Sequence, residues 1–405
     1  MRVQLITQLF DPENAIKGLS FVKELASYGY DVEVVTTFPS YPGGEIYPGY
    51  RMRLFQVEDV EGVRVVRLPS YISHGRSAVG RLISYTSFSF SAFIYCLLFS
   101  RRPDVIYSYY PPMMGGVASA LLSIIRRRPF IYDVQDLWPE ALVATGMLKS
   151  ERIIRCLDFI INWIYRRASA IVVLSDGYKK TLISKGVPES KIHRVYNWCD
   201  ESRIQIHSGS YSDTKEYFDI AYAGNMGPAQ ALKYILNAAK VLQNEGNNKI
   251  RFTLIGDGIE CNDLKQKAAF LGLNNVLFKG RVLPELVGAE LQAADALLVH
   301  LADEPVFSIT IPSKTQAYLA MGKPILMAVA GESAEIIEKA RAGIVSPPCA
   351  PEEIARIALA MSKSSPSQLI SFGERAKDFY INNMSQRNGV EKISFLIGML
   401  IRNKS

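Results

Sequence analysis

The sequence of 405 residues predicts an α/β protein made of two tandem domains, each built around a doubly wound parallel β-sheet. Short apolar runs rich in β-branched and aromatic residues alternate with longer stretches of helical periodicity, as buried parallel strands and their crossover helices require. The pattern breaks in the polar segment 201–216, which is interpreted as a linker, and then starts again. Each half is long enough to bury a core of its own.

The predicted strands follow one another in the same way in both halves. In residues 1–200 they cover 3–9, 31–38, 63–68, 104–109, 129–134, 170–174 and 192–196. In residues 217–384 they cover 218–223, 251–255, 276–278, 296–301 and 324–328. Between the first two strands, Ile16, Leu19, Val22 and Leu25 keep the spacing of one helix face, and Gly29 ends that helix. Because parallel sheets bind ligands beyond the carboxyl ends of their strands, we expect the two domains to face a ligand-binding cleft.

Charge and composition narrow the possible functions. The formal net charge is +7, and residues 1–200 carry most of it, with 24 lysines and arginines against 18 aspartates and glutamates. This basic half suits anionic lipid or a phosphorylated substrate, whereas the lack of any RNA-binding or helix-turn-helix pattern disfavours nucleic acid. Five scattered cysteines and four histidines without ligand spacing predict neither a redox pair nor a metal site. The first apolar run ends at Asp11, which favours a strand over a signal peptide.

Three helix-like stretches of the first half are each followed by arginines. The stretches are 82–100, 113–125 and 153–165, and the arginines stand at 101–102, 126–128 and 166–167. Cations at a helix C-terminus complement the helix dipole, and the same pattern also suits a basic face resting on anionic lipid. Stretch 82–100 has no charged residue over nearly the length of a membrane span, so a transmembrane, an interfacial and a buried helix all remain open.

Three segments combine a turn with the start of a helix, where free backbone N–H groups attract phosphate. Gly18 precedes the first helix, and in segment 221–232 a glycine turn is followed by Pro228, at which the next helix is expected to begin. In segment 311–324, Ser313 is placed to cap a helix and Lys314 adds a positive charge, which suits a diphosphate. The alternative in each case is an ordinary turn or an ordinary capped helix.

Carboxylates gather in segment 130–140, at the carboxyl end of a buried strand. Asp133, Asp136 and Glu140 stand beside Trp138, which is typical of a sugar-binding or acid–base site, with a solvated loop as the alternative. The chain has no Asp-X-Asp pattern for holding a diphosphate through a metal. Phosphate charge would then be met by helix starts and by cations such as Lys314, Arg281 or Lys279. We therefore predict no metal and no other cofactor.

The order of these segments resembles the retaining glycosyltransferases of family 4, which have the GT-B fold of two Rossmann-like domains facing a cleft. The sequence is most similar to the bacterial L-fucosamine-transferase-like branch of O-antigen and capsule synthesis. The resemblance covers nearly the whole chain through ASYGYDVEVVTTFPSYP, YDVQDLWPE, AIVVLSDGYKKTLISKGVPESKIHRVYNWCD, YAGNMGPAQAL, IGDGIECNDLK, FKGRVLPEL, IPSKTQAYLAMGKPIL and AGIVSPP.

The resemblance implies a role for each of these segments. Residues 1–200 would form the acceptor-side domain, with a last helix at about 385–402 packing back on it, and residues 217–384 would bind the donor. The donor site it implies consists of Gly18, Gly224, Asn225, Gly227, Gln230, Gly256, Asp257, Arg281, Val282, Ser313 and Lys314. Gln135, Asp136 and Lys314 would be catalytic, Gln135 standing where many relatives carry a histidine. Asp133, Trp138 and Glu140 would lie on the acceptor side.

One departure from the family concerns the two glutamates that many members use near the donor ribose. Ile309 and Ala317 stand at those positions, and Asp303 or Glu304 would have to serve instead. The expected activity is transfer of a sugar from a UDP-linked donor to a lipid-linked saccharide. The protein is expected in the cytoplasm, peripherally bound to the inner face of the cytoplasmic membrane through anionic lipid. A UDP-sugar epimerase and a non-catalytic scaffold are the alternatives.

Overall fold

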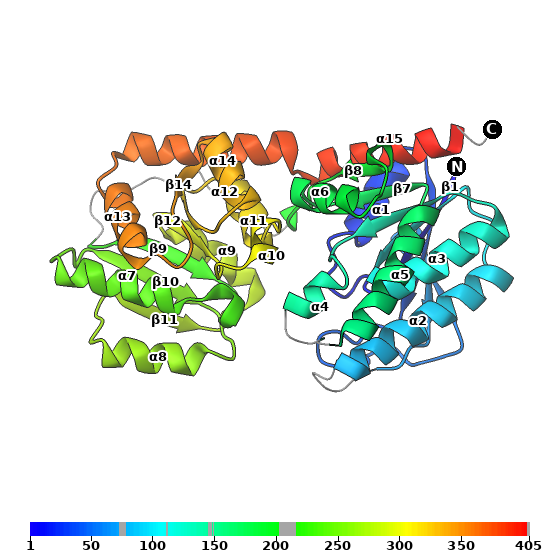
Figure 1. Ribbon diagram of the computed structural model, residues 1–405, viewed down its shortest axis with the longest axis horizontal. Coiled ribbons are helices and arrows are strands. Elements are labelled where there is room, and N and C mark those ends of the chain that lie inside the picture. The colour runs from blue at the N-terminus through cyan, green and yellow to red at the C-terminus, as the bar shows by residue number, and fades with distance from the viewer. Residues whose placement is uncertain (73–77, 111, 145–147, 149, 202–215, 403–405) are drawn as a thin grey trace. The chain divides into compact units, whose positions relative to one another are not determined.

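The computed structural model describes residues 1–72, 78–110, 112–144, 148, 150–201 and 216–402. Almost all of the expected linker 201–216 therefore lies outside the described residues. The chain divides into two compact units. Unit 1 comprises Met1–Tyr196 together with Gln386–Ser405, and unit 2 comprises Asn197–Ser385. Both units are α/β, with helices packed around a central sheet (Figure 1).

The sheet of unit 1 has the strand order β3-β4-β2-β1-β5-β6-β7-β8. All neighbours are parallel except β3 and β4. The strands are β1 (Arg2–Thr7), β2 (Asp31–Thr37), β3 (Gln56–Val60), β4 (Val63–Leu68), β5 (Val105–Tyr110), β6 (Phe130–Val134), β7 (Ala170–Val173) and β8 (Ile192–Arg194). The chain order reverses between β1 and β5, and ligands of such sheets bind beyond the carboxyl ends of the strands at this point.

Several helices of unit 1 pack against one another. The helices of this unit are α1 (Leu19–Ser27), α2 (Ala78–Leu98), α3 (Pro112–Arg126), α4 (Glu140–Ala144), α5 (Glu151–Arg167), α6 (Asp176–Ser184) and α15 (Gln386–Arg402). Helices α2, α3 and α5 pack side by side, and α1 packs against α15 (Figure 1). The C-terminal helix α15 is fixed to unit 1 by the Tyr30 hydroxyl, which donates to the Ser394 carbonyl over 2.8 Å.

The sheet of unit 2 is entirely parallel and has the Rossmann order β11-β10-β9-β12-β13-β14. Its strands are β9 (Phe218–Ala223), β10 (Ile250–Ile255), β11 (Val276–Gly280), β12 (Ala296–His300), β13 (Ile325–Ala328) and β14 (Gly343–Val345). Its helices are α7 (Lys233–Asn244), α8 (Cys261–Phe270), α9 (Pro284–Ala293), α10 (Pro305–Ser308), α11 (Ser313–Met321), α12 (Glu332–Ala340), α13 (Pro351–Ser362) and α14 (Pro366–Asn383). The order reverses between β9 and β12, so the loops after these strands define the expected ligand position.

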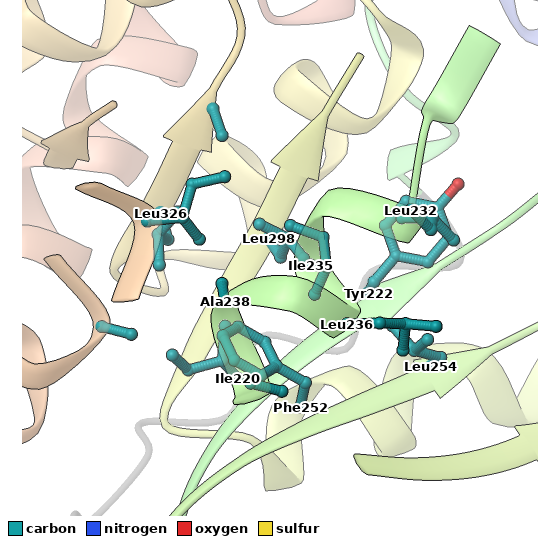
Figure 2. Close-up of a cluster of buried hydrophobic side chains, with 14 of the residues drawn as sticks. Ile220, Tyr222, Leu232, Ile235, Leu236, Ala238, Phe252, Leu254, Leu298 and Leu326 are labelled. Carbon is teal, nitrogen blue, oxygen red and sulfur yellow. The ribbon is translucent and has the colours of Figure 1, made fainter. Parts of the chain in front are cut away.

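The core of unit 2 lies between the sheet and helices α7 and α13. Figure 2 shows Leu232, Ile235 and Leu236 of the α7 region in one buried cluster with Ile220 of β9 and Leu298 of β12. All five side chains are fully buried. Burying an aliphatic side chain of this size stabilises a fold by about 1.5–3 kcal/mol, so this layer fixes the strands whose ends carry the site.

The observed elements follow the predicted periodicity closely, with two omissions. Strands 63–68 and 218–223 are confirmed at both ends. The sequence did not predict β3, which is half-exposed and carries acidic residues, or β14, which has only three residues. All but the last two residues of stretch 82–100 lie in α2, whose Phe88, Ala92 and Cys96 are buried in unit 1 while Phe90 and Leu98 are exposed. Over the described parts of the chain, no helix has both the length and the apolarity of a membrane span.

Candidate functional site

Two glycine loops interlock at the carboxyl edge of the unit 2 sheet. The loop after β9 is joined to the loop after β10 by hydrogen bonds from Gly224 N to Ile255 O and from Met226 N to Asp257 O, both 2.9 Å. A Cβ atom on Gly256, whose φ is +130°, would lie 2.0 Å from the Gly224 carbonyl oxygen, and one on Gly258 would lie 2.2 Å from the Met226 carbonyl oxygen. The two loops can approach this closely only because both positions are glycine.

Lys314 extends from the start of α11 over the first of these loops. A Cβ atom on Gly224 would lie 2.8 Å from Lys314 Nζ, and the ammonium group stands 4.8 Å from the centroid of the Tyr222 ring. Burial lowers the pKa of Lys314 to about 8. Among the residues that the structure describes, no carboxylate forms an ion pair with this lysine. A partly desolvated cation beside the backbone of a glycine, which has no side chain to block access, is suited to an anionic ligand.

Two tyrosines and an inter-loop hydrogen bond hold this arrangement in place. The Tyr318 hydroxyl of α11 accepts from Ala223 N over 3.0 Å, and the Tyr222 hydroxyl donates to the Asn225 carbonyl. Ala302 N donates to Ala229 O over 2.9 Å and so ties the loop after β12 to the loop after β9. Hydrogen bonds therefore join the loops after β9 and β12, between which the strand order reverses. The same region is joined to α11, the helix that carries Lys314.

Two predicted helix starts are wrong in detail. Ser313 does not cap α11, because it is the first helical residue and Pro312 occupies the capping position, with no side-chain cap. Pro228 begins only a short 3-10 turn, Pro228–Gln230, which ends at Ala231 in the left-handed region. Helix α7 begins later, at Lys233. The anion nest predicted at Pro228 thus has no α-helix directly behind it, whereas Ser313 begins α11, a helix of nine residues.

The remaining donor-side residues fall into two groups. Gln230 accepts from Gly227 N over 3.2 Å and from Asn225 Nδ2 over 3.1 Å, so its side chain builds the turn itself. Asp257 and Arg281 are exposed, and Val282 is half-buried. They follow β10 and β11, and a hydrogen bond from Gly256 N to Gly280 O joins the ends of these two strands.

Other residues considered for phosphate or ribose contacts have different surroundings. Lys279 pairs with Glu290 and is therefore engaged within unit 2. Ile309 directly follows α10, and Ala317 is half-buried in α11. Asp303 and Glu304, expected as substitutes for the missing glutamates, are exposed in the loop after β12.

His300 supports the site from the end of β12. Its Nδ1 lies 2.7 Å from the Gln230 carbonyl oxygen and must donate to it, which leaves Nε2 to accept from Cys349 N over 3.4 Å. The ring is buried and stacks on Tyr234. Burial lowers the pKa of His300 to about 4, although the hydrogen bond to Gln230 acts in the opposite direction.

We predict that His300 makes the stability of unit 2 fall as the pH is lowered from 6.5 to 4. The unfolded chain binds a proton at the ordinary histidine pKa of 6.5 and the folded chain only near 4, so acid favours unfolding within this window. The loss reaches about 3 kcal/mol at the low end. Chemical denaturation of wild type and His300→Asn, followed at several pH values, checks it. A wild-type-minus-variant difference that does not change between pH 7 and pH 4 would contradict the assignment.

At the corresponding edge of unit 1, Asp133, one of the predicted acceptor residues, belongs to a buried ion pair. Lys17 Nζ is 2.5 Å from Asp133 Oδ2, and both side chains are essentially inaccessible to solvent. The Tyr107 hydroxyl also donates to Oδ2, and Gln135 Nε2 donates to Oδ1, each over 2.5 Å. Burial, followed by the charge of Asp133, raises the pKa of Tyr107 well above its ordinary value. Asp133 is thus enclosed by protein donors, and its predicted contact with an acceptor is corrected to an internal role.

Gly18 also has a different environment from the one predicted. A carboxylate oxygen of Asp11 accepts from Leu19 N over 2.6 Å and would lie 2.4 Å from a Cβ on Gly18. The N-terminus of α1 is therefore already neutralised by a side chain of the same loop. A phosphate could reach this helix start only by displacing Asp11.

The other candidates of unit 1 lie at its surface. Gln135 is partly buried and held by Asp133, while Asp136 reaches solvent. Crowding by the surrounding protein partly desolvates the Asp136 carboxyl and raises its pKa. Trp138 is half-buried, and Glu140 forms an ion pair with Lys185 over 2.5 Å. Over the described residues, no group of three or more histidine, cysteine, aspartate or glutamate side chains is arranged to hold a metal.

The sequence reasoning missed the residues that support the site. Lys17 directly precedes the selected Gly18, and Tyr222 directly precedes the strand end at Ala223. A lysine directly before a glycine and an aromatic residue beside a glycine turn were the only signals available. The contacts that give them roles, with Asp133 and Lys314, are distant in sequence.

Comparison with known proteins agrees with this geometry. Residues 19–198 match the glycosyl transferase 4-like domain, and residues 217–364 match the glycosyl transferases group 1 family. WbjE of Pseudomonas aeruginosa, which is named as a glycosyltransferase, is 27% identical over 324 residues, 77% of this chain and 79% of the relative. WcaI of Escherichia coli, named for colanic acid biosynthesis, is 25% identical over 315 residues, 74% of this chain and 76% of the relative.

A solved structure of similar fold extends over both units. HepE of Anabaena, determined in complex with UDP and glucose, has a TM-score of 0.64 and 18% identity, covering 98% of this chain and 99% of that chain. Its fold is the GT-B fold that the sequence predicted. The two matched domains, the named relatives and this fold together show that the chain is a glycosyltransferase of the GT-B class, with a glycosyl transferase 4-like domain followed by a group 1 domain.

Proposed function

We propose that unit 2 binds a UDP-linked sugar, with its diphosphate against Lys314 and the backbone of Gly224. The observation that carries this proposal is the partly buried ammonium group, which has no ion-pair partner among the described residues and stands over a glycine loop at the chain reversal of the sheet. The UDP complex of HepE, a protein of the same fold, supports the choice of nucleotide. The resemblance to L-fucosamine-transferase-like enzymes favours an N-acetylhexosamine or a deoxy derivative as the sugar.

The chemistry follows from the charge that develops during transfer. The bond from the anomeric carbon to the diphosphate oxygen breaks, a bond to an acceptor hydroxyl forms, and that hydroxyl loses its proton. Lys314 and the first N–H groups of α11 stabilise the negative charge on the departing diphosphate, without need of a divalent metal. Gln135 and Asp136 act on the sugar and acceptor, and the anomeric configuration is retained, as the family resemblance implies.

We further propose that unit 1 receives a lipid-linked saccharide of O-antigen or capsule synthesis at the cytoplasmic membrane surface. Leu98 at the end of α2 and Phe99 after it, together with Ile124 and Ile125 of α3, are exposed, and we call them the arginine-edged face. Arginines 101, 102 and 127 beside them are exposed as well. Exposed apolar side chains edged by cations are typical of a surface that rests on anionic lipid.

One arginine of this region has the alternative, structural role. Arg126 donates to the Cys96 and Leu97 carbonyl oxygens over 2.6 and 2.9 Å, and so caps the C-terminus of α2. Helix-dipole complementation therefore accounts for Arg126, and the lipid contact is proposed for its exposed neighbours only.

A thermal-shift screen of nucleotide sugars tests the proposed donor. A UDP-sugar at one hundred times its Kd is expected to stabilise unit 2 by about 2.7 kcal/mol, because it binds only the folded state. The shift should persist in EDTA and should be absent for ATP and NAD. If no nucleotide sugar stabilises the protein while another nucleotide does, the proposed donor class is wrong.

A further inference from the structure

An apolar groove lies on unit 1 between α2 and the β3–β4 edge of the sheet. Its volume is about 220 Å³, and its walls are formed by Leu54, Phe55, Leu68, Pro69, Phe90, Ser91, Ile94, Tyr95 and Phe99. The rings of Phe55, Tyr95 and Phe99 pack on one another at centroid distances of 5.8 to 6.1 Å. Apart from the Ser91 and Tyr95 hydroxyls, every side chain that lines the groove is a hydrocarbon.

The side chains at the rim of the groove are exposed to a degree that is unusual for large apolar residues. Leu54 is 84% exposed, Phe90 67% and Phe99 61%. A soluble surface carries single exposed apolar residues without consequence, but several that converge on one hollow indicate a binding surface. Residues of α2 line the hollow on one side and residues beside β3 and β4 on the other, and its volume of about 220 Å³ suits an apolar chain better than a broad protein face.

The groove begins at the edge of the sheet where the substrate is expected. Pro69 directly follows β4, and Phe55 directly precedes β3, which is antiparallel to β4. Both residues therefore stand at the carboxyl edge of the parallel strands. Phe90, Ser91, Ile94 and Tyr95 of α2, with Phe99 just beyond the helix, form the opposite wall, and the Phe99 ring packs directly on that of Phe55. A molecule with its polar end at the sheet edge could thus place an apolar chain between the two walls.

Cations stand near the lining residues and indicate the charge of the occupant. Arg51 and Arg53 immediately precede Leu54, and Arg101 and Arg102 follow Phe99 by two and three positions. All four are exposed, and α2 contains no acidic residue. An apolar channel with arginines beside its lining segments is complementary to an amphiphile that carries a phosphate and a single hydrocarbon chain.

We propose that this groove binds the hydrocarbon chain of a phosphate-bearing lipid, the carrier of the acceptor saccharide. The inference rests on the proposed lipid-linked acceptor and assigns its chain to a defined groove, which shares Phe99 with the arginine-edged face but none of its other three residues. The face contacts the bilayer surface, whereas the groove takes one chain out of it. Binding should therefore depend on chain length and should saturate.

The probe is hexadecyl phosphate with a diazirine near the end of its chain, used with the full-length protein below the micelle concentration. Irradiation and peptide mapping are expected to place the label in segments 52–55 and 90–99. Excess unlabelled hexadecyl phosphate should displace it, and butyl phosphate should not. Ser91→Trp, which fills the groove, and Leu54→Asp, which puts an anion at its exposed mouth, should each reduce labelling by about tenfold or more, the loss expected when two methylene groups are excluded.

Ile125→Ser is the matched control. It removes an exposed apolar side chain of the arginine-edged face that does not line the groove. This variant should label like wild type but float less with vesicles of phosphatidylglycerol, whereas Ser91→Trp should still float. Thermal unfolding of all three variants verifies that they fold. If Ser91→Trp does not fold, Leu54→Asp still tests the proposal.

Three results would overturn the proposal. The first is labelling that excess hexadecyl phosphate does not displace. The second is labelling of Ser91→Trp and Leu54→Asp at the wild-type level. The third is a wild-type dimer that Ser91→Trp dissociates, because a second copy of the chain would then be the occupant. Stabilisation by nucleotide sugars is measured on the same samples. If it persists while saturable labelling is absent, only the groove assignment fails; saturable labelling without nucleotide-sugar stabilisation counts against the donor instead.

Discussion

Lys314→Ala is expected to slow sugar transfer by about 10²–10³-fold, the usual cost of removing one preorganised charge that stabilises a leaving group. The lysine is the cation nearest to the glycine loop that we assign to the diphosphate, and it has no ion pair among the described residues of unit 2. Its removal therefore leaves no buried carboxylate uncompensated. The unfolding free energy of unit 2 should change by less than about 1 kcal/mol, since only a cation–π contact with Tyr222 is lost.

The pH dependence of wild type provides a second, independent reading of the same residue. Because burial lowers the pKa of Lys314 to about 8, the free enzyme loses this positive charge as the pH rises through 8. The value of kcat/KM, which reports the free enzyme, should fall on the alkaline side with that pKa. A bound diphosphate favours the charged form, so the corresponding fall in kcat should move to higher pH.

Two variants separate the charge from other effects. Lys314→Met keeps most of the side-chain volume and should be as slow as Lys314→Ala. Lys279→Ala removes a cation of the same unit that is already paired with Glu290, and it should retain activity within about threefold, as expected for a surface pair. Initial rates with a radiolabelled nucleotide sugar measure all three. Equal rates for wild type and Lys314→Met would remove Lys314 from the leaving-group role.

The sequence predicted the fold better than the site because the two depend on different kinds of pattern. Strands such as 218–223 are apolar runs buried on both faces, and their hydrophobicity alone locates them. Strand β3 was missed because it is an edge strand. Its sequence QVEDV alternates half-buried and exposed residues and so lacks a continuous apolar run. Hydrophobic periodicity reflects burial, so it predicts buried strands more reliably than exposed ones.

Functional residues were found where a local motif carries the chemistry and misjudged where a distant partner decides it. Lys314 at a helix start was identified from four adjacent residues, IPSK. Asp133 was placed at an open acceptor site, because nothing nearby in the sequence shows that Lys17 and Tyr107 enclose it. Gly18 was assigned to phosphate for the same reason, since Asp11 reaches α1 across the loop. Side-chain contacts between separate strands and loops are a product of the fold and cannot be inferred from spacing alone.

The Lys17–Asp133 pair provides the second large effect. Lys17→Met should lower the unfolding free energy of unit 1 by about 3–5 kcal/mol, because it leaves a fully buried carboxylate without its cation. Lys23→Met is the matched control a few residues away. Lys23 pairs with Glu61 over 2.8 Å, but both side chains are more than half exposed, so this loss should stay below about 1 kcal/mol.

The double variant Lys17→Met/Asp133→Leu shows whether the pair exists for stability or for positioning. The double variant has no buried carboxylate left without a cation, so most of the stability lost in Lys17→Met should return. Activity should not return with it, because Asp133 also accepts from Gln135, which we assign to the reacting sugar. Urea denaturation and transfer kinetics on the same four proteins measure both quantities. Full recovery of kcat in the double variant would mean that the pair only stabilises unit 1. A Lys17→Met variant no less stable than Lys23→Met would mean that the buried pair does not stabilise unit 1.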